Sequence, residues 1–302
     1  MFTLGTTSVS PMPLAKQTAR ILRGVARHLD PPAEPTSRPV AVADLPLLPD
    51  SAPSAPGSRK ASMFFEAHPR FYSTSKTAAS RARLNLRFEG IFSENRDILD
   101  GARVLDIASH DGRWSLAALE CGAKSVVGIE ARPDLVAHAN ANLEHYGYQS
   151  DRYRFIVGDV HEVLNSADFD VDVVLCLGFL YHTMRYNDLF RGIRRTNARH
   201  VIIDTTAPGM MDPQASIRVF REPSAKQSAA AADDFTFGTS VLTGRPNLAA
   251  IRSMLDCYGY RVERLSDWAG LLRDNPQLEH PKYAKQQRIT LRCVDSASAP
   301  AR

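Results

Sequence analysis

Short apolar runs rich in β-branched residues alternate with helical segments through the middle of the chain. The apolar runs that predict strands occupy residues 103–108, 125–130, 153–157, 171–177 and 200–204. Helical spacing of apolar positions predicts helices over residues 113–121, 133–146 and 187–197. Such alternation is typical of βαβ units, so we expect an α/β fold with a doubly wound, mainly parallel sheet and helices on both of its faces.

A second block of the pattern follows an insertion. Residues 206–245 interrupt the alternation with a Met/Pro/Gly stretch, an alanine run and a β-prone segment at 235–242. A predicted helix at 246–258 and predicted strands at 260–265 and 288–293 then resume it. Long insertions of this kind are usually lids or binding loops, so we expect residues 206–245 to lie over a site.

The first 62 residues differ in composition from the rest of the chain. Ten of the nineteen prolines lie in residues 1–60, with many Ser and Ala and almost no aromatic residues, which predicts a flexible arm. Basic residues recur in this arm at helical spacing, at Lys16, Arg20, Arg23 and Arg27. This pattern fits a transit peptide, a surface-seeking amphipathic helix or a solvated basic tail. After the arm we expect a helical cover at residues 63–100, the main domain at 101–294 and a tail at 295–302.

Composition excludes several classes of protein. No apolar run approaches the roughly 18 to 20 residues that a membrane-spanning helix needs, so we expect a soluble, cytoplasmic protein. The four cysteines form no CxxC pair for zinc or redox chemistry. Lys and Arg number 37 against 33 Asp and Glu, a balance that neither demands nor excludes a polyanionic partner.

The turn after the first predicted strand is the first candidate for chemistry, because ligands of open parallel sheets bind beyond the carboxyl ends of the strands. The turn reads Asp106-Ile107-Ala108-Ser109-His110-Asp111-Gly112. The second predicted strand ends at Glu130, where a carboxylate can accept two hydrogen bonds from the ribose hydroxyls of a cofactor. Asp159 follows the third predicted strand.

These residues resemble the class I S-adenosylmethionine-dependent methyltransferases, whose first motif is an acidic residue in a strand followed by a Gly-x-Gly-x-Gly turn. The resemblance runs from residue 103 to residue 293 and implies a seven-stranded sheet with an antiparallel C-terminal strand. It implies S-adenosylmethionine as methyl donor, with its methionine part against the turn that holds Asp106, Ala108, Ser109, His110 and Gly112. It also implies that Glu130 binds the ribose and that Asp159 reaches the adenine amine.

Two of the three motif glycines are replaced, the first by Ala108 and the second by His110, while Gly112 is kept. Glycine accepts positive φ and lets a ligand approach the backbone. We therefore expect Ala108 and His110 either to adopt a strained backbone or to reshape the pocket. The Gly-x-Gly-x-x-Gly string of nicotinamide-binding enzymes does not occur, so hydride transfer is disfavoured.

A second resemblance lies at the end of the fourth predicted strand. The segment Leu177-Gly178-Phe179-Leu180-Tyr181-His182 contains a Gly-x-Leu-Tyr-His string. It is similar to the bacterial wobble-uridine carboxymethyltransferase group and to several sugar and small-molecule methyltransferases. The resemblance implies that Leu177 borders the cofactor and that Tyr181 and His182 lie nearest the sulfonium.

His182 is the predicted base for a hydroxyl nucleophile, because imidazole titrates near neutrality. A histidine that only bonds backbone at a strand exit is the alternative, and His110 is a second candidate base. His161 is expected on the adenine side or at the surface, and Trp114 and Phe179 in the core.

Other charged residues have open roles. Asp204 ends the fifth predicted strand and could hold a metal with His182, Asp233 or Asp234, but no spacing argument enforces this and no metal is assigned. Arg218, Arg221 and Arg245 could meet an anionic substrate or form a solvated face. Lys76, Arg81 and Arg83 could cover the cofactor's carboxylate or be exposed.

The leading hypothesis is a methyltransferase that acts by in-line displacement on a hydroxyl of a sugar or other small molecule. One alternative is an enzyme that transfers a methyl or carboxymethyl group to tRNA or another RNA. Against it, a basic face is usual in RNA-binding proteins, and here the net charge is only +4. The other alternative is a non-catalytic scaffold that keeps the fold and binds a protein partner.

Overall fold

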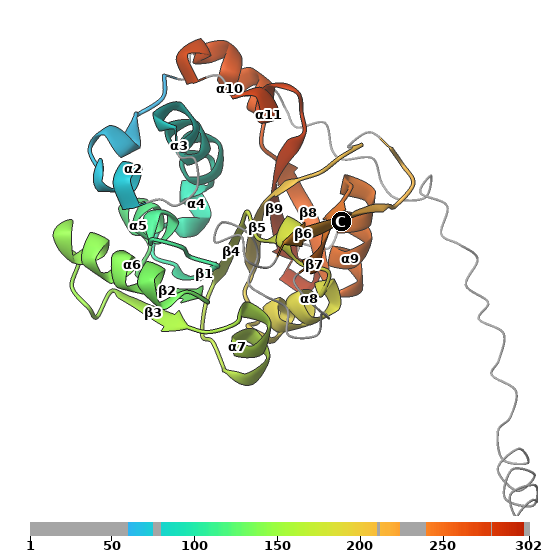
Figure 1. The fold of residues 1–302 in the computed structure, drawn as a ribbon, viewed down its shortest axis with the longest axis horizontal. Coiled ribbons are helices and arrows are strands. Elements are labelled where there is room, and N and C mark those ends of the chain that lie inside the picture. The colour runs from blue at the N-terminus through green and yellow to red at the C-terminus, as the bar shows by residue number, and fades with distance from the viewer. Residues whose placement is uncertain (1–59, 75–79, 210–211, 224–239, 279, 299–302) are drawn as a thin grey trace, which may run out of the picture. The chain divides into compact units, whose positions relative to one another are not determined.

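A seven-stranded sheet forms the centre of the computed structural model, in the strand order β3-β2-β1-β4-β5-β9-β8 (Figure 1). The strands are β1 Arg103–Ile107, β2 Ser125–Glu130, β3 Tyr153–Val157, β4 Val173–Leu177, β5 His200–Thr206, β8 Tyr260–Leu265 and β9 Arg288–Asp295. Neighbouring strands are parallel, except that β9 runs antiparallel to both β5 and β8. The predicted doubly wound sheet with an antiparallel C-terminal strand is confirmed.

The structure describes residues 60–74, 80–209, 212–223, 240–278 and 280–298. All of them belong to the unit Leu47–Arg302. The predicted arm up to residue 59, the end of the predicted tail, Lys76, Asp233 and Asp234 lie outside the described residues. Within the described ranges, no helix has both the length and the apolar character that crossing a bilayer requires.

Helices cover both faces of the sheet. They are α3 Arg81–Arg87, α5 Arg113–Glu120, α6 Pro133–His145, α7 Val160–Ser166, α8 Tyr186–Arg195, α9 Leu248–Cys257 and α10 Trp268–Asp274, with shorter α2 Arg70–Thr74, α4 Arg96–Leu99 and α11 Pro281–Ala284. Successive strand residues point to opposite faces and build two cores. On β4, Leu175 packs in a core with α3, α5 and α10, whereas Val174 and Cys176 pack in a core with α7, α8 and α9.

The predicted N-terminal cover is helical but not regular. After α3 the chain continues as a π-helical turn, η3 Phe88–Phe92, then as η4 Ser93–Asn95 and α4. Gly90 lies in the π turn against the indole of Trp268, and a Cβ at Gly90 would come within 2.4 Å of the ring. Close packing of this helix on α10 therefore requires glycine at this position.

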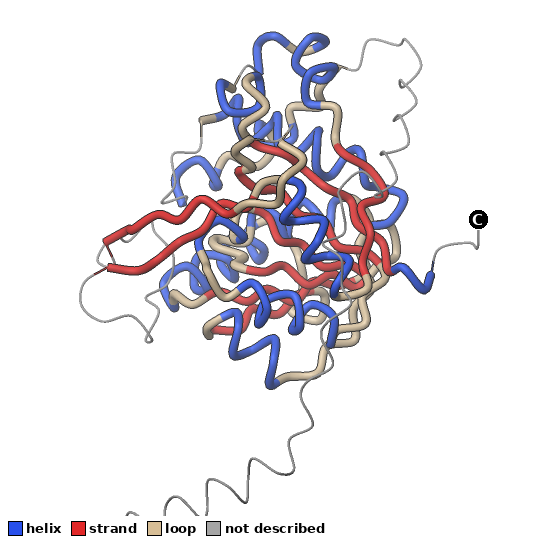
Figure 2. Tube along the Cα trace, turned by 90° about the vertical axis from the view of Figure 1, so that its right-hand side faces the viewer, coloured by secondary structure: helices blue, strands red, loops and turns tan. Residues whose placement is uncertain are grey.

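The insertion contains a two-stranded antiparallel hairpin that projects from the sheet (Figure 2). Its strands are β6 Ile217–Pro223 and β7 Ser240–Pro246. Side chains alternate between its two faces: Val219 and Leu242 are about half exposed on one face, whereas Val241 and Thr243 are buried on the other. The hairpin thus turns one face toward the domain.

Candidate active site

The loop after β1 has the backbone geometry of a glycine motif without two of its glycines. Ala108, His110 and Gly112 have φ values of 54°, 56° and 79°. All three are in the left-handed region, where a non-glycine residue costs roughly 1–2 kcal/mol. Of the two outcomes expected from the replaced glycines, the strained backbone is the one observed.

The loop lies at the point where strand order reverses, because β1 pairs with β2 on one side and with β4 on the other. The N–H of Ser109 donates to the carbonyl of Ile129 at 2.9 Å, and the N–H of His110 donates to Oε2 of Glu130 at 3.0 Å. A Cβ at Gly112 would lie 3.1 Å from Ala139 of α6. Gly112 therefore allows the loop after β1 to pack closely against α6.

Three buried polar atoms around this loop have no hydrogen-bond partner among the described residues. They are Oδ1 of Asp106, Oγ of Ser109 and Nε2 of His110. Burial raises the pKa of Asp106 to about 7, although Ser115 donates to its Oδ2 at 2.7 Å. Unsatisfied buried groups are costly, so their grouping at one loop favours a ligand there.

His110 is uncharged and has a defined tautomer. Nη2 of Arg113 lies 2.6 Å from its Nδ1, and a guanidinium only donates, so Nδ1 accepts and Nε2 carries the proton. Asp111 lies 3.3 Å from the same Nδ1, but its carboxylate accepts from Arg113 and Thr74. Burial and the charge of Arg113 lower the pKa of His110. This arrangement disfavours His110 as the base.

Glu130 ends β2 as a buried carboxylate with three donors. Oε1 accepts from the N–H and from Nε of Arg132, both at 3.1 Å, and Oε2 accepts from His110. A carboxylate has about four acceptor positions. One position on Oε2 therefore remains for a ribose hydroxyl while Arg132 stays in place.

Asp159 begins α7 as its N-cap. Oδ1 accepts from the N–H groups of His161 and Glu162 at 2.8 and 3.1 Å, and Nη1 of Arg185 lies 3.8 Å away. Part of the carboxylate therefore stabilises the helix start. His161 is buried and its Nε2 lies 3.1 Å from the hydroxyl of Thr183, so it is not at the surface.

The segment after β4 turns at Gly178, which has a φ of 103°, into the short helix η5 Leu180–His182. The Tyr181 hydroxyl accepts from Nη1 of Arg288 at 3.2 Å. Burial alone would raise the pKa of Tyr181, but Arg288 reverses this and the pKa is lowered. The rings of Tyr181 and His182 lie with their centroids 4.3 Å apart.

His182 is partly buried in a cationic environment. The backbone N–H of His182 donates to the carbonyl of Phe179 at 2.8 Å. The buried ring nitrogen Nδ1 has no hydrogen-bond partner among the described residues. Burial, and then Arg288 and Arg245, lower its pKa to about 4. The imidazole is therefore neutral at pH 7 and able to accept a proton.

A buried charge cluster beside Tyr181 was missed by the sequence reasoning. Asp204 accepts from Nη2 of Arg87 at 2.9 Å and Nε of Arg288 at 2.7 Å. Tyr283 and Thr290 donate to its other oxygen at 3.0 and 2.8 Å. These partners occupy the oxygens that a metal would need, and the described residues contain no metal-binding group of three His, Cys, Asp or Glu.

The predicted cover is joined to the loop after β1 by hydrogen bonds that no sequence pattern indicated. Thr74, which ends α2, donates to Oδ2 of Asp111 at 2.8 Å. Asn142 of α6 donates to the carbonyl of Asp111 at 2.9 Å and accepts from Nε of Arg70 at 3.0 Å. The segment before β1 thus helps to hold the loop in its strained form.

The remaining predicted residues are placed as follows. Trp114 is buried in the core, as expected, whereas Phe179 is only partly buried. Arg245 lies over the ring of Phe220 at 4.0 Å, on the hairpin itself. Arg81 is exposed and pairs with Glu66 at 3.2 Å.

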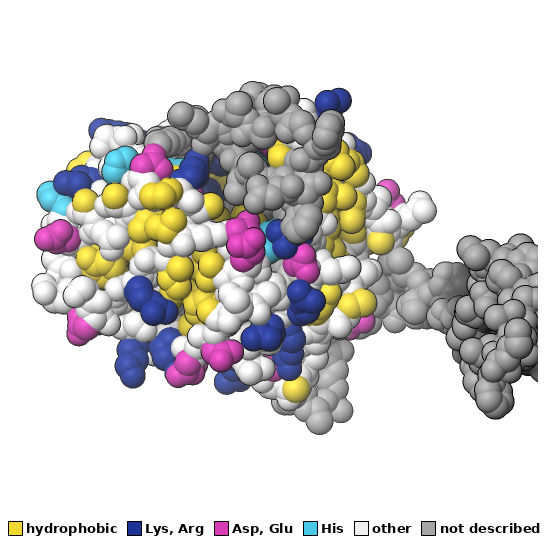
Figure 3. Space-filling view, turned by 60° about the horizontal axis from the view of Figure 1, so that its bottom comes forward, with side chains coloured by type: hydrophobic (Ala, Val, Ile, Leu, Met, Phe, Trp, Pro, Cys, Tyr) yellow, Lys and Arg dark blue, Asp and Glu magenta, His cyan; other side chains and the backbone are white. Residues whose placement is uncertain are grey.

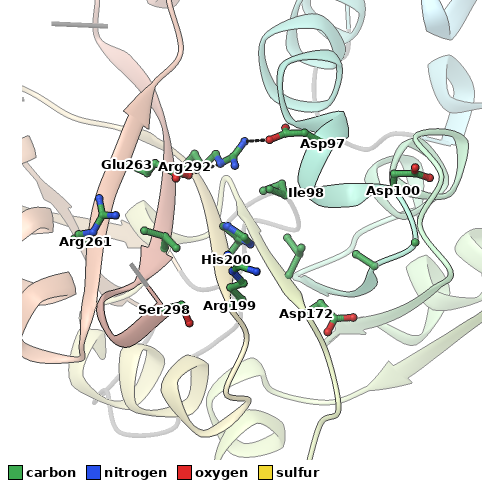
Figure 4. Close-up of a pocket in the computed structure, with 14 residues that line it drawn as sticks. Asp97, Ile98, Asp100, Asp172, Arg199, His200, Arg261, Glu263, Arg292 and Ser298 are labelled. Atoms are coloured by element: carbon green, nitrogen blue, oxygen red, sulfur yellow. Dashed lines mark hydrogen bonds and ion pairs between the residues drawn. The ribbon is translucent and has the colours of Figure 1, made fainter. Parts of the chain in front are cut away.

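A separate pocket of about 530 Å³ lies at the opposite edge of the sheet (Figure 4). Val173 and His200, which line it, are the first residues of β4 and β5, so it opens at the amino ends of the strands. Arg292 crosses it to pair with Asp97 at 2.6 Å. None of the predicted site residues lies in this pocket.

Residues 104–199 match the family model of a methyltransferase domain. This part of the chain, from β1 to the loop before β5, is similar to that domain. A relative from Methanocaldococcus jannaschii, named as a ribosomal RNA large subunit methyltransferase, is 30% identical over 132 residues. This match covers 39% of the chain and 34% of the relative, so the chain spans about a third of the length of the curated relative it matches.

Solved methyltransferases resemble the described fold at low sequence identity. The magnesium protoporphyrin IX methyltransferase of Synechocystis PCC 6803 with bound S-adenosylhomocysteine is 17% identical, with a TM-score of 0.48, over 78% of this chain and 95% of that one. An S-adenosylmethionine-dependent methyltransferase of Mesorhizobium loti is 14% identical, with a TM-score of 0.47, over 65% and 92%.

The predicted Rossmann-like α/β fold is confirmed by the strand order, and the match of residues 104–199 to a methyltransferase domain agrees with the predicted resemblance to class I S-adenosylmethionine-dependent methyltransferases. S-adenosylmethionine is the methyl donor that the predicted resemblance implies. The residues present fit it: the loop after β1 keeps the left-handed backbone of the motif, and the orphaned atoms of Asp106, Ser109 and His110 surround that loop.

Proposed function

We propose that the protein transfers a methyl group from S-adenosylmethionine to a hydroxyl of a sugar or other small molecule, with His182 as the base. The observation that carries this proposal is the uncharged imidazole of His182 and its place just after β4. It is a neutral imidazole one short turn beyond β4, and the cations that lower its pKa include Arg132, the neighbour of Glu130 in the loop after β2. It therefore lies within electrostatic reach of the strand ends where a donor would bind.

In this proposal the donor is held by the ends of β1, β2 and β3. The loop with Ala108 to Gly112 lies against its methionine part, one free position on Glu130 accepts from its ribose, and Asp159 meets its adenine. Leu177 borders the donor on the side of β4. When bound, S-adenosylmethionine supplies an electrophilic methyl group on a positively charged sulfur.

The chain's own residues then have to align the acceptor, exclude water and remove one proton. Tyr181 and His182 lie side by side and form the wall nearest the reacting oxygen. His182 takes the hydroxyl proton. In this proposal the described parts of the predicted cover and the hairpin of β6 and β7 lie beside the acceptor.

Binding and transfer are tested separately. Calorimetry with S-adenosylhomocysteine should give a specific heat of binding, and labelled donor should pass its methyl group to a hydroxyl in a panel of sugars and small metabolites. His182→Ala should keep the dissociation constant for S-adenosylhomocysteine and lose about 10²–10⁴-fold in rate. Full methyl transfer by His182→Ala would overturn the assignment of His182 as the base. No heat of binding with S-adenosylhomocysteine or with S-adenosylmethionine would overturn the proposed enzymatic activity and favour the non-catalytic scaffold.

An RNA acceptor is the second candidate, and the name of the relative from Methanocaldococcus jannaschii favours it. On the face drawn in Figure 3, Lys and Arg side chains of the described residues are interspersed with Asp and Glu. The RNA hypothesis is tested by titrating tRNA and ribosomal RNA fragments at two salt concentrations. A steep loss of affinity with salt, together with methyl transfer to RNA, would replace the small-molecule proposal.

A further inference from the structure

The hairpin brings a carboxylate to the proposed base. Oε2 of Glu222, on β6, lies 4.0 Å from Nδ1 of His182. Both side chains are about one quarter exposed, and this Nδ1 is the buried nitrogen without a hydrogen-bond partner among the described residues. A hydrogen bond needs a separation of about 3 Å, so the two groups are roughly 1 Å too far apart for one.

The hairpin is anchored next to His182. β7 packs against η5, and the N–H of Gly244 on β7 donates to the carbonyl of Thr183 at 3.2 Å. A Cβ at Gly244 would come within 2.3 Å of the Tyr186 hydroxyl, so this close approach requires glycine. β6 is the other strand of the hairpin, and Glu222 pairs there with the buried Val241, on the face turned toward the domain.

Glu222 is the only anion within 4 Å of His182 among the described residues, whereas several cations act on the same imidazole. Arg288 on β9, Arg245 on β7, Arg132 after β2 and Lys282 on α11 all disfavour a charge on the imidazole. The Tyr181 ring packs beside it. An imidazole in that field is uncharged, but it is a weak base, because accepting a proton places a fifth positive charge among the four.

We propose that Glu222 is a positioning residue: a small movement of its partly exposed side chain lets the carboxylate accept the Nδ1–H of His182 and leaves Nε2 as the proton-accepting nitrogen. This step rests on the proposed function. The acceptor oxygen forms a bond to the methyl carbon, the carbon–sulfur bond breaks with its electron pair on sulfur, and the hydroxyl proton moves to Nε2. The resulting imidazolium is stabilised by Glu222 and loses its proton to water after product release.

The role of Glu222 is tested first without any turnover. The full chain with ¹⁵N-labelled histidine, with and without S-adenosylhomocysteine, is titrated by NMR, and the His182 signals are assigned by their loss in His182→Gln. In the unaltered protein Nδ1 should carry the proton in the neutral form. Glu222→Gln should lower the proton affinity of His182 about tenfold, since it removes a nearby opposite charge.

The matched control is Glu144→Gln, an exposed position on α6 that should leave the titration unchanged. Glu222→Asp keeps the charge on a shorter side chain and should restore part of the proton affinity. A His182 titration in Glu222→Gln that shifts less than threefold, in both the free and the liganded protein, overturns the proposal. This result stands whether or not an acceptor is known.

Kinetics provide the second readout. With a hydroxyl acceptor, Glu222→Gln should lower kcat about tenfold at neutral pH and move the acid limb of the pH profile to lower pH, with the KM for the donor unchanged. A purely structural role would weaken binding of the donor and leave the acid limb in place. Absence of transfer in the unaltered protein counts against the proposed function and leaves the NMR result on Glu222 intact.

Discussion

The backbone N–H of His110 donates to Oε2 of Glu130 at 3.0 Å, so the loop after β1 is fixed to the end of β2. One carboxylate therefore supports the strained loop and, in the proposed function, receives the ribose. Arg132 donates to the other oxygen, Oε1, so the positions of the loop after β1 and of Arg132 both depend on the charge of Glu130.

Glu130→Gln should weaken binding of S-adenosylhomocysteine by about 10–100-fold. The amide keeps one acceptor oxygen but loses the charge-assisted bonds, which are worth about 1.5–3 kcal/mol each. Calorimetry measures the change, and Glu162→Gln, an exposed position on α7, is the control. An unchanged dissociation constant for Glu130→Gln would remove Glu130 from the donor site.

Ala108→Gly should stabilise the protein by up to about 1 kcal/mol. Glycine relieves the left-handed strain at φ 54°, and this gain exceeds the entropy that glycine adds to the unfolded chain. The same substitution at Ala137, exposed in the middle of α6, should destabilise by about 1 kcal/mol. Urea unfolding of both variants checks the opposite signs, and a loss of stability in Ala108→Gly contradicts the strain argument.

The strands and most helices were predictable because their signal is local. β-Branched runs and helical spacing placed β1 to β5 within two residues of their observed bounds. The loop after β1 was predictable in position but not in backbone geometry, since Ala108 and His110 rarely adopt positive φ and are held there by Glu130, Thr74 and Asn142.

The cluster at Asp204 could not be read from the sequence for a different reason. Arg87 and Arg288 lie 117 and 84 residues from Asp204 along the chain. Arg87 also occupies a helix whose apolar pattern gave no reason to bury a guanidinium. Only the folded sheet, with β9 paired to β5, brings these charges together.

Asp106→Asn should change how stability depends on pH. The pKa of Asp106 is raised from 3.8 to about 7 by burial, so the folded state keeps a proton that the unfolded state loses above 3.8. This stabilisation is complete below pH 3.8 and is lost as the pH rises to 7. The melting temperature of Asp106→Asn relative to the unaltered protein should therefore rise by several degrees between pH 5 and pH 8. Calorimetric scans at both values test this, and a constant difference contradicts it.

Asp204→Asn should destabilise the fold by about 3–5 kcal/mol, because it leaves Arg87 and Arg288 buried without their common counter-charge. The arginines lower the pKa of Asp204 from 3.8 to about 2 against the effect of burial, so its contribution is present above pH 3.8 and is lost as the pH falls toward 2. Urea unfolding at pH 7 gives the free energy directly. The control is Arg191→Met, which breaks a largely exposed pair with Asp188 and should cost less than about 1 kcal/mol. If Asp204→Asn lost no more than Arg191→Met, the buried cluster would not be what holds β5, β9 and α3 together.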